Sequence, residues 1–282
     1  MFNFFKRKKK DPLGELKTIL GGYELPSFST TVINVLNKLR DPESSMGEIV
    51  SLIELDPGMT VKILRLVNSV GFGLTSKTGN LQHAIALMGR SRLEPLVLSF
   101  GVSDSLPSTM ECMERGLFWA TSARRACLAR IIGRHLHAAS QADCFTVGLL
   151  MDMAIPILDH IHRGEYGEVL ARWHADDESQ LTDMELEVFG YDHAAIGGLM
   201  AEAWGLPEYI VHSIAAHHMY DPDSQAEPAV QLVSRLKYLD RENGLEKLAE
   251  TAQLEYAIER PLIEEMINQS FTYAEQFTGF FR

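Results

Sequence analysis

The 282-residue sequence lacks most features of a membrane, secreted or disulfide-bonded protein. No uninterrupted apolar run reaches the roughly 18 residues that a membrane-spanning helix needs. The N-terminus has no apolar segment followed by a small-residue cleavage site, as a secretion signal would. The three cysteines, Cys112, Cys127 and Cys144, form no CxxC pair, and an odd number suits a reducing compartment. We therefore expect a cytoplasmic protein.

Strand patterns and phosphate-binding loops are also missing. No segment shows sustained alternation of apolar and polar residues between turn signals, as a half-buried strand would. Gly71-Phe72-Gly73 lacks the strand-to-helix context of a nucleotide-binding loop. No serine or cysteine stands in a pattern with histidine that would indicate a nucleophilic enzyme. The predicted fold class is all-α.

Positive charge is scarce outside one short segment. The net charge is −12, yet the first ten residues contain five basic residues and no acidic one, so the rest of the chain has a net charge of −17. A body this acidic repels a phosphate backbone, and we expect no general nucleic-acid binding. We predict that residues 1–13 form a disordered basic tip. The alternative is weak contact of residues 1–10 with a membrane surface, because Phe2, Phe4 and Phe5 precede the basic run.

Helical periodicity runs through nearly the whole chain. Apolar stripes repeat at i, i+3, i+4 and i+7, and capping-box patterns occur at Ser45 to Glu48 and at Ser91 to Glu94. Later helices are predicted over residues 115–138, 143–162, 182–189, 193–204 and 208–218. The segment 106–109 is a predicted joint between two lobes, 14–105 and 106–225. Residues 226–282 are predicted to form a helical C-terminal extension, whose apolar stripe must be buried: Leu262, Ile263, Met266 and Ile267.

Several short motifs occur in a fixed order along the chain. They are Leu25-Pro26, Asp56-Pro57, Asn68-Ser69, Trp119, Gly148-Leu149-Leu150 and Trp204-Gly205-Leu206-Pro207. In this order they resemble the landmarks of the HDOD family, which is related to the HD and HD-GYP metal-dependent phosphohydrolases. The resemblance implies a two-lobed helical HD-like bundle over residues 14–225 and a bacterial regulatory module. Among the landmarks, we predict structural roles for Pro26, Asp56, Pro57, Asn68, Ser69, Trp119 and Trp204.

The HD enzymes hold a metal with one histidine, a later His-Asp pair and a final aspartate. Placed on this pattern, the chain has Thr121 at the first histidine and Met151 at the second. Ser234 or Arg235 stands near the final aspartate, so that only Asp152 matches. A thioether and a hydroxyl bind Mg²⁺ or Mn²⁺ poorly, and a guanidinium would repel a cation. The resemblance therefore implies an incomplete HD site.

Three further histidines keep two hypotheses open. His193, and the adjacent pair His217-His218, resemble histidines that HD-GYP enzymes use for a second metal. We favour a non-catalytic bacterial signal-transduction module, in which Asp152 is a buried carboxylate hydrogen-bonded to a histidine or to backbone N–H groups. The alternative is a divergent metal-dependent phosphohydrolase that uses Asp152, His193, His217 and His218.

The two hypotheses imply different ligands. For the module we expect no cofactor and a protein partner, with a nucleotide as the alternative ligand of the HD-like cleft. The resemblance points to a cyclic-dinucleotide or two-component pathway, and the alternative requires a divalent metal. The sequence leaves the oligomeric state open. Elsewhere, His135 and His137 share a basic helix face with Arg130 and Arg134, which we interpret as solvated rather than catalytic.

Overall fold

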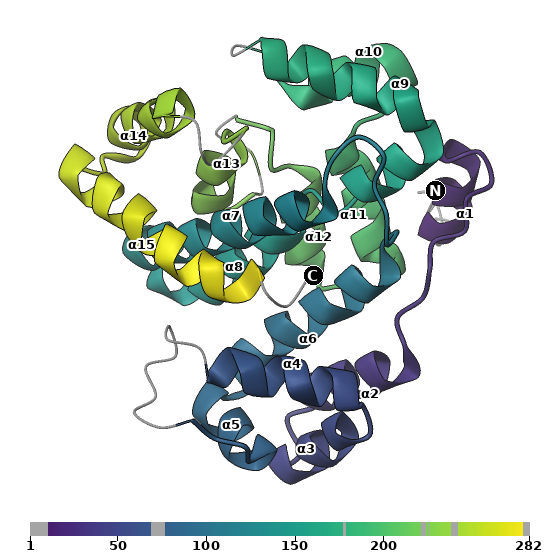
Figure 1. Cartoon of the computed structure of the whole chain (residues 1–282), viewed down its shortest axis with the longest axis vertical. Coiled ribbons are helices and arrows are strands. Elements are labelled where there is room, and N and C mark those ends of the chain that lie inside the picture. The colour runs from purple at the N-terminus through teal and green to yellow at the C-terminus, as the bar shows by residue number, and fades with distance from the viewer. Residues whose placement is uncertain are drawn as a thin grey trace, which may run out of the picture.

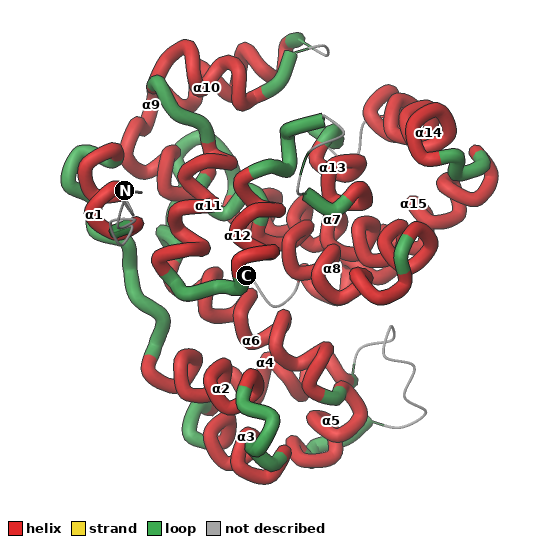
Figure 2. Tube along the Cα trace, turned by 180° about the vertical axis from the view of Figure 1, so that it is seen from behind, coloured by secondary structure: helices red, strands yellow, loops and turns green. Residues whose placement is uncertain are grey.

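The computed structural model describes residues 11–68, 77–176, 179–220, 224, 226–237 and 242–278. These residues form helices joined by loops and contain no strand, which confirms the all-α prediction (Figure 2). Residues 1–10 of the predicted basic tip lie outside the described residues, as does Ser69. Pro12 and Leu13, which we assigned to the tip, belong instead to the first turn of α1 (Pro12–Ile19), which Asp11 caps.

Four helices of the N-terminal part pack on one another at the lower end of Figure 1. They are α2 (Thr30–Arg40), α3 (Met46–Glu54), α4 (Pro57–Val67) and α5 (Leu81–Met88). The predicted capping box of α3 is confirmed, because Ser45 Oγ accepts from Glu48 N at 3.2 Å and Glu48 Oε2 accepts from Ser45 N at 2.8 Å. Asp56 caps α4 through Met59 N at 2.9 Å, with Pro57 at its first position. These local signals explain where the helices begin.

Helix α6 (Arg90–Ser105) connects these four helices to the rest of the protein. It packs against α2 and α5 and also against α8. The predicted capping box from Ser91 to Glu94 is wrong. Gly89 takes a positive φ of 69° and lets α6 begin at Arg90, so Ser91 already lies inside the helix. Glu94 pairs instead with Arg40 at 2.7 Å.

The helices α7 (Arg115–Leu136) and α8 (Gln141–Leu150) form the centre of the larger part (Figure 1). The two helices pack closely against each other because small residues face each other across their contact. A Cβ added at Gly148 would lie 3.0 Å from Ala126 Cα, and one added at Gly133 would lie 2.6 Å from Cys144 Sγ. Trp119 is 1% exposed on α7. The α7–α8 pair therefore tolerates little extra volume.

Further helices surround this pair. They are α9 (Ile155–Ala175), α10 (Leu181–Phe189), α11 (His193–Ala203), α12 (Glu208–Ala215), α13 (Pro228–Ser234), α14 (Glu242–Tyr256) and α15 (Arg260–Thr278). Helix α15 lies across α7 in Figure 1, and it buries Ile263, Met266 and Ile267 of the predicted stripe, while Leu262 is half-buried. The C-terminal helices thus pack on the larger part.

The N-terminal helix α1 packs on α11, away from α2 to α5 (Figure 1). Residues 23–29, which form no helix, run from α1 to α2. Trp204 Nε1 donates to Pro26 O at 2.9 Å, and the Trp204 ring stacks on Phe28 with centroids 4.8 Å apart. The proposed lobe 14–105 is therefore divided in space between the two parts of the molecule, and its exact boundaries stay a prediction.

Among the described residues, one helical stretch, Ala138–Ala175, is long and apolar enough to cross a membrane by length and composition alone. Its most apolar window is 89% buried inside the protein, and the stretch is interrupted between α8 and α9. Burial of this kind is typical of a core helix, so the apolar character is explained by packing.

Candidate metal-binding site

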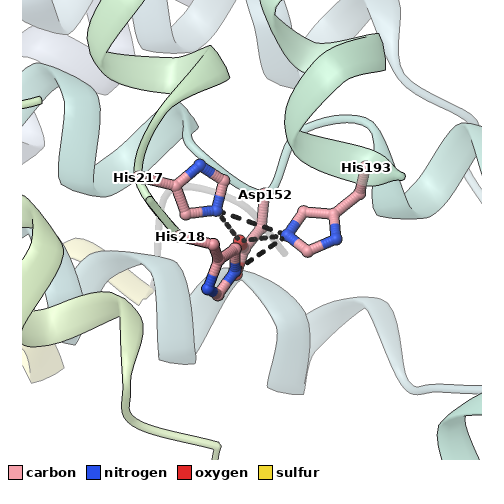
Figure 3. Close-up of side chains that lie close together, drawn as sticks. All are labelled: Asp152, His193, His217 and His218. Atoms are coloured by element: carbon pink, nitrogen blue, oxygen red, sulfur yellow. Dashed lines mark hydrogen bonds and ion pairs between the residues drawn. The ribbon is translucent and has the colours of Figure 1, made fainter. Parts of the chain in front are cut away.

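Asp152 lies in a turn between two helices. The predicted helix over 143–162 is wrong, because α8 ends at Leu150 and α9 begins at Ile155. Pro156 has no N–H to donate to the carbonyl of Asp152, four residues earlier. That carbonyl accepts from Ile155 N at 2.9 Å in a tighter turn instead. The turn positions the buried Asp152 side chain, 7% exposed, in a polar cluster (Figure 3).

Three histidines from two other parts of the chain join Asp152. His193 is the first residue of α11, whose N-cap Asp192 accepts from Ala195 N at 2.7 Å. His217 and His218 follow the end of α12. Figure 3 shows their rings pointing toward the Asp152 carboxylate. One ligand atom from each of the four residues lies within 4.8 Å of all the others. The structure thus brings together the four residues that the sequence singled out.

The spacing of these atoms suits a small cation. His193 Nε2 lies 3.4 Å from Asp152 Oδ1, 3.3 Å from His217 Nε2 and 3.2 Å from His218 Nε2. His217 Nε2 also lies 3.4 Å from Asp152 Oδ1. Ligands about 2.0 to 2.1 Å from a tetrahedral zinc ion are about 3.3 Å apart. These four separations match four of the six edges of such a tetrahedron.

Hydrogen bonds on the far side of two rings place a proton on Nδ1 and turn Nε2 toward the cluster. His217 Nδ1 lies 2.6 Å from Ile214 O, a carbonyl that only accepts, so the ring proton is on Nδ1. His193 Nδ1 lies 2.6 Å from Glu185 Oε2, which also accepts from His193 N at 2.8 Å. Tyr166 in turn donates to Glu185 Oε1 at 2.5 Å. A carboxylate that orients a histidine in this way is typical of metal sites.

Hydrogen bonds behind the His218 ring also place its proton on Nδ1. Ser234 Oγ lies 2.8 Å from His217 O and 2.9 Å from Gln231 O, so its proton is donated to a carbonyl. Tyr220 must then donate to Ser234 Oγ, 3.1 Å away. The Tyr220 oxygen therefore accepts from His218 Nδ1 at 3.2 Å. This leaves Nε2 of His218 without a proton as well.

His217 and His218 are neutral at ordinary pH. Burial, and then the neighbouring His193, lower the pKa of His217 to about 3. Burial, followed by His217 and His193, lowers the pKa of His218 well below its usual value. Three imidazole Nε2 atoms and one carboxylate oxygen therefore lie close together. Such a donor set fits a borderline divalent cation such as zinc.

Arg125 is the residue that the sequence analysis missed. It lies on α7, is 5% exposed, and donates to the second carboxylate oxygen of Asp152 and to Leu236 O. Burial lowers its pKa to about 10, so it stays positively charged at neutral pH. The available signal was the pair Arg124-Arg125 within the otherwise apolar stretch from Ala123 to Ala129. The cation weakens the carboxylate as a metal ligand, since it already balances the negative charge.

The three positions that depart from the HD pattern have other contacts. Met151 is fully buried, and Ser234 bonds to His217 O. Arg235, which we considered as the repelling guanidinium, stacks over the Tyr220 ring at 4.1 Å. Thr121 lines a cavity of about 30 Å³ beside Asp152, bounded by described residues of α7 and α9 and by Lys237. A space of this size holds about one water molecule.

The predicted structural residues make local contacts. Asn68 caps α4 and uses its side chain to accept from Thr78 N at 2.6 Å and to donate to Thr78 O at 2.7 Å. It thus joins the two ends of the segment that separates α4 from α5. The contacts of Pro26, Asp56 and Pro57 described above likewise involve helix ends and packing.

Comparison with known proteins identifies the family. The HDOD domain family matches residues 25–220, which is more than half of the chain. This chain belongs to the HDOD family. Among solved structures, the HDOD chain is similar to a candidate phosphohydrolase from Shewanella amazonensis SB2B, with a TM-score of 0.75 and 17% identity over 95% of this chain and 98% of that chain. An HDOD domain protein of unknown function from Geobacter sulfurreducens gives a TM-score of 0.73 and 19% identity, over 96% of this chain and 98% of that chain.

Two more relatives differ in length from the HDOD chain. A candidate signal transduction protein from Marinobacter aquaeolei VT8 has a TM-score of 0.72 and 16% identity, over 98% of this chain and 62% of that chain. An uncharacterized protein from Treponema pallidum (strain Nichols) is 25% identical over 234 residues, which cover 80% of this chain and 44% of that protein. The chain thus spans less than half the length of this curated relative. At these identities the solved structures show a common fold.

Proposed function

We propose that this HDOD chain is a non-catalytic module of a cytoplasmic bacterial signalling pathway that acts by binding a protein partner. The observation that carries the proposal is the closed geometry of the Asp152 cluster. Four side chains already offer four ligand atoms, whereas catalytic zinc sites keep one position for water or substrate. The neighbouring cavity of about 30 Å³ is far too small for a phosphate ester.

The cluster then has a structural role. Asp152, His193, His217 and His218 would hold a divalent cation, which would cross-link the α8–α9 turn, the start of α11 and the end of α12. The protein itself supplies the orientation, through Glu185 and Tyr166 behind His193 and through Ile214 behind His217. Arg125 neutralises the buried carboxylate from the opposite side.

Membership of the HDOD family supports a signalling role, as does the likeness in fold to a candidate signal transduction protein. A two-component or cyclic-dinucleotide pathway is the context that the family suggests. In that context, the protein would pass on a signal through its surface, and its buried cluster would keep the domain folded.

The second candidate function is a divergent metal-dependent phosphohydrolase. The convergence of Asp152, His193, His217 and His218, with an oriented carboxylate behind one of them, specifically favours it. For hydrolysis, one of the four ligands must move away to make room for a water nucleophile. His218 is the half-buried member of the set, whereas the other three are buried, and it is the ligand with most room to move.

The experiment combines metal analysis with an activity assay. Protein prepared without a histidine tag is analysed for metal, and phosphodiester and nucleotide hydrolysis are assayed with Mn²⁺, Mg²⁺ or Ni²⁺. We expect no turnover above background, whether or not metal is bound. Turnover that is lost in Asp152→Ala but kept in His212→Ala, a change of a histidine with a 44% exposed side chain on α12, would overturn the proposal and establish the second function.

A further inference from the structure

A second, larger cavity lies apart from the Asp152 cluster. It measures about 540 Å³ and shares no lining residue with the cluster or with the small cavity beside Asp152. Its walls come from α4, α5 and α6, from the α7–α8 pair, and from α15. This volume lies within the range of about 300 to 1,000 Å³ that small-molecule sites occupy.

The lining of this cavity is positively charged. Arg92 comes from α6, and Arg130 and Arg134, one helical turn apart, come from α7. No carboxylate is found among the described residues that line it, although the whole chain has a net charge of −12. Neither Arg130 nor Arg134 forms an ion pair with a described residue. Like charges one turn apart repel each other, so an anion in the cavity would relieve this repulsion.

Aromatic and amide side chains share the cavity with the arginines. The Arg130 guanidinium lies 5.5 Å from the ring centroid of Phe145, on α8, and 5.6 Å from that of Tyr273, on α15. Gln141 and Gln269 offer hydrogen-bonding groups from the same two helices. A planar base can stack on aromatic rings and on a guanidinium, and amides can read its edge. The cavity therefore combines groups for phosphates with groups for a base.

We propose that this cavity binds a nucleotide. The phosphates contact Arg92 and Arg134, and the base lies against the group formed by Arg130, Phe145 and Tyr273. This assignment goes beyond the signalling role proposed above and does not depend on the Asp152 cluster. A ligand in this position touches α6, α7, α8 and α15 at once, so its binding is coupled to the packing of these helices.

The test is calorimetric titration of the full chain with ATP and with GTP, at low and at high salt. Adenosine, guanosine and inorganic triphosphate serve as comparison ligands. We expect at least one nucleotide to bind more tightly than its nucleoside and than triphosphate, with weaker binding at high salt. Arg134→Gln should weaken binding at least tenfold, and because Arg134 is exposed and has no ion pair with a described residue, the variant should fold normally.

The control variant is Arg172→Gln, which removes the same charge from α9. The Arg172 side chain is 51% exposed and does not line the cavity, so affinity should stay within twofold of the wild type. Several results would overturn the proposal: no binding of either nucleotide at millimolar concentration, equal affinity for nucleoside or for triphosphate, or equal losses in the two variants. Tighter, Arg134-dependent binding of an acidic peptide would also overturn it and would assign the cavity to a protein segment.

Discussion

Replacing Asp152 by asparagine tests how the buried ion pair stabilises the protein. Asp152 is 7% exposed and Arg125 is 5% exposed, so neither charge is compensated by solvent. Removal of one partner of such a pair leaves the other charge buried and typically costs about 3 to 5 kcal/mol. Asparagine keeps the shape and one acceptor oxygen, so we expect a loss near 3 kcal/mol, and Asp152→Ala should lose more.

The loss should be visible in thermal and in urea unfolding. For a chain of this size, 1 kcal/mol corresponds to a shift of about 2 to 4 °C in Tm, so Asp152→Asn should lower the Tm by at least about 6 °C. All samples are dialysed against chelator first, so that metal loss does not contribute. The control is Glu187→Gln, which breaks an exposed pair with Arg172 at 2.9 Å and should cost less than about 1 kcal/mol.

A double variant separates the pair from other effects of the substitution. Arg125→Met together with Asp152→Asn removes both charges and fills the space with an uncharged chain of similar length. Because neither partner is then left alone, the double variant should lose less than the sum of the two single losses, by at least about 1.5 kcal/mol. Strictly additive losses, or a stability of Asp152→Asn within about 0.5 kcal/mol of the wild type, would refute the reasoning.

Two further predictions concern packing and one hydrogen bond. Gly133→Ala should destabilise the protein by about 1 to 3 kcal/mol because its Cβ would meet Cys144 Sγ at 2.6 Å. Gly116 lies on the same helix, and a Cβ added there would meet no neighbouring atom within 4 Å, so Gly116→Ala should be neutral or stabilising by up to about 1 kcal/mol. Equal urea midpoints for the two variants would contradict this. Trp204→Phe keeps the ring but loses the donor to Pro26 O, so a fall of about 0.5 to 1.5 kcal/mol in the free energy of unfolding is expected, and an unchanged urea midpoint would count against that bond.

The helices could be predicted from the sequence where the signal is local. The capping box at Ser45 needs only Ser45 and Glu48, and both form the expected bonds. The same pattern at Ser91 failed because the positive φ of Gly89 starts the helix two residues earlier, a conformation that the pattern does not report. The break beside Asp152 had a local signal in Pro156, which periodicity alone overlooks.

The candidate site was only partly accessible to sequence reasoning. The four residues of the cluster came from a family resemblance, and the structure brings them together. Glu185 was missed because acidic side chains are almost never fully buried. It stands four residues after Leu181, on the buried face of the helix, whereas Asp183 and Glu187 share another face. Glu185 is fully buried and bonds to His193. That bond depends on the packing of α10 against α11, which the sequence does not report.

The path of the chain between its two parts has a mechanical consequence. The polypeptide crosses from the larger part to α2 through residues 23–29, and it returns through α6. Because α6 packs against α2 and α5 and also against α8, any shift of the N-terminal helices against the larger part has to move α6 as well. The bond between Trp204 and Pro26 holds the other connection against the larger part.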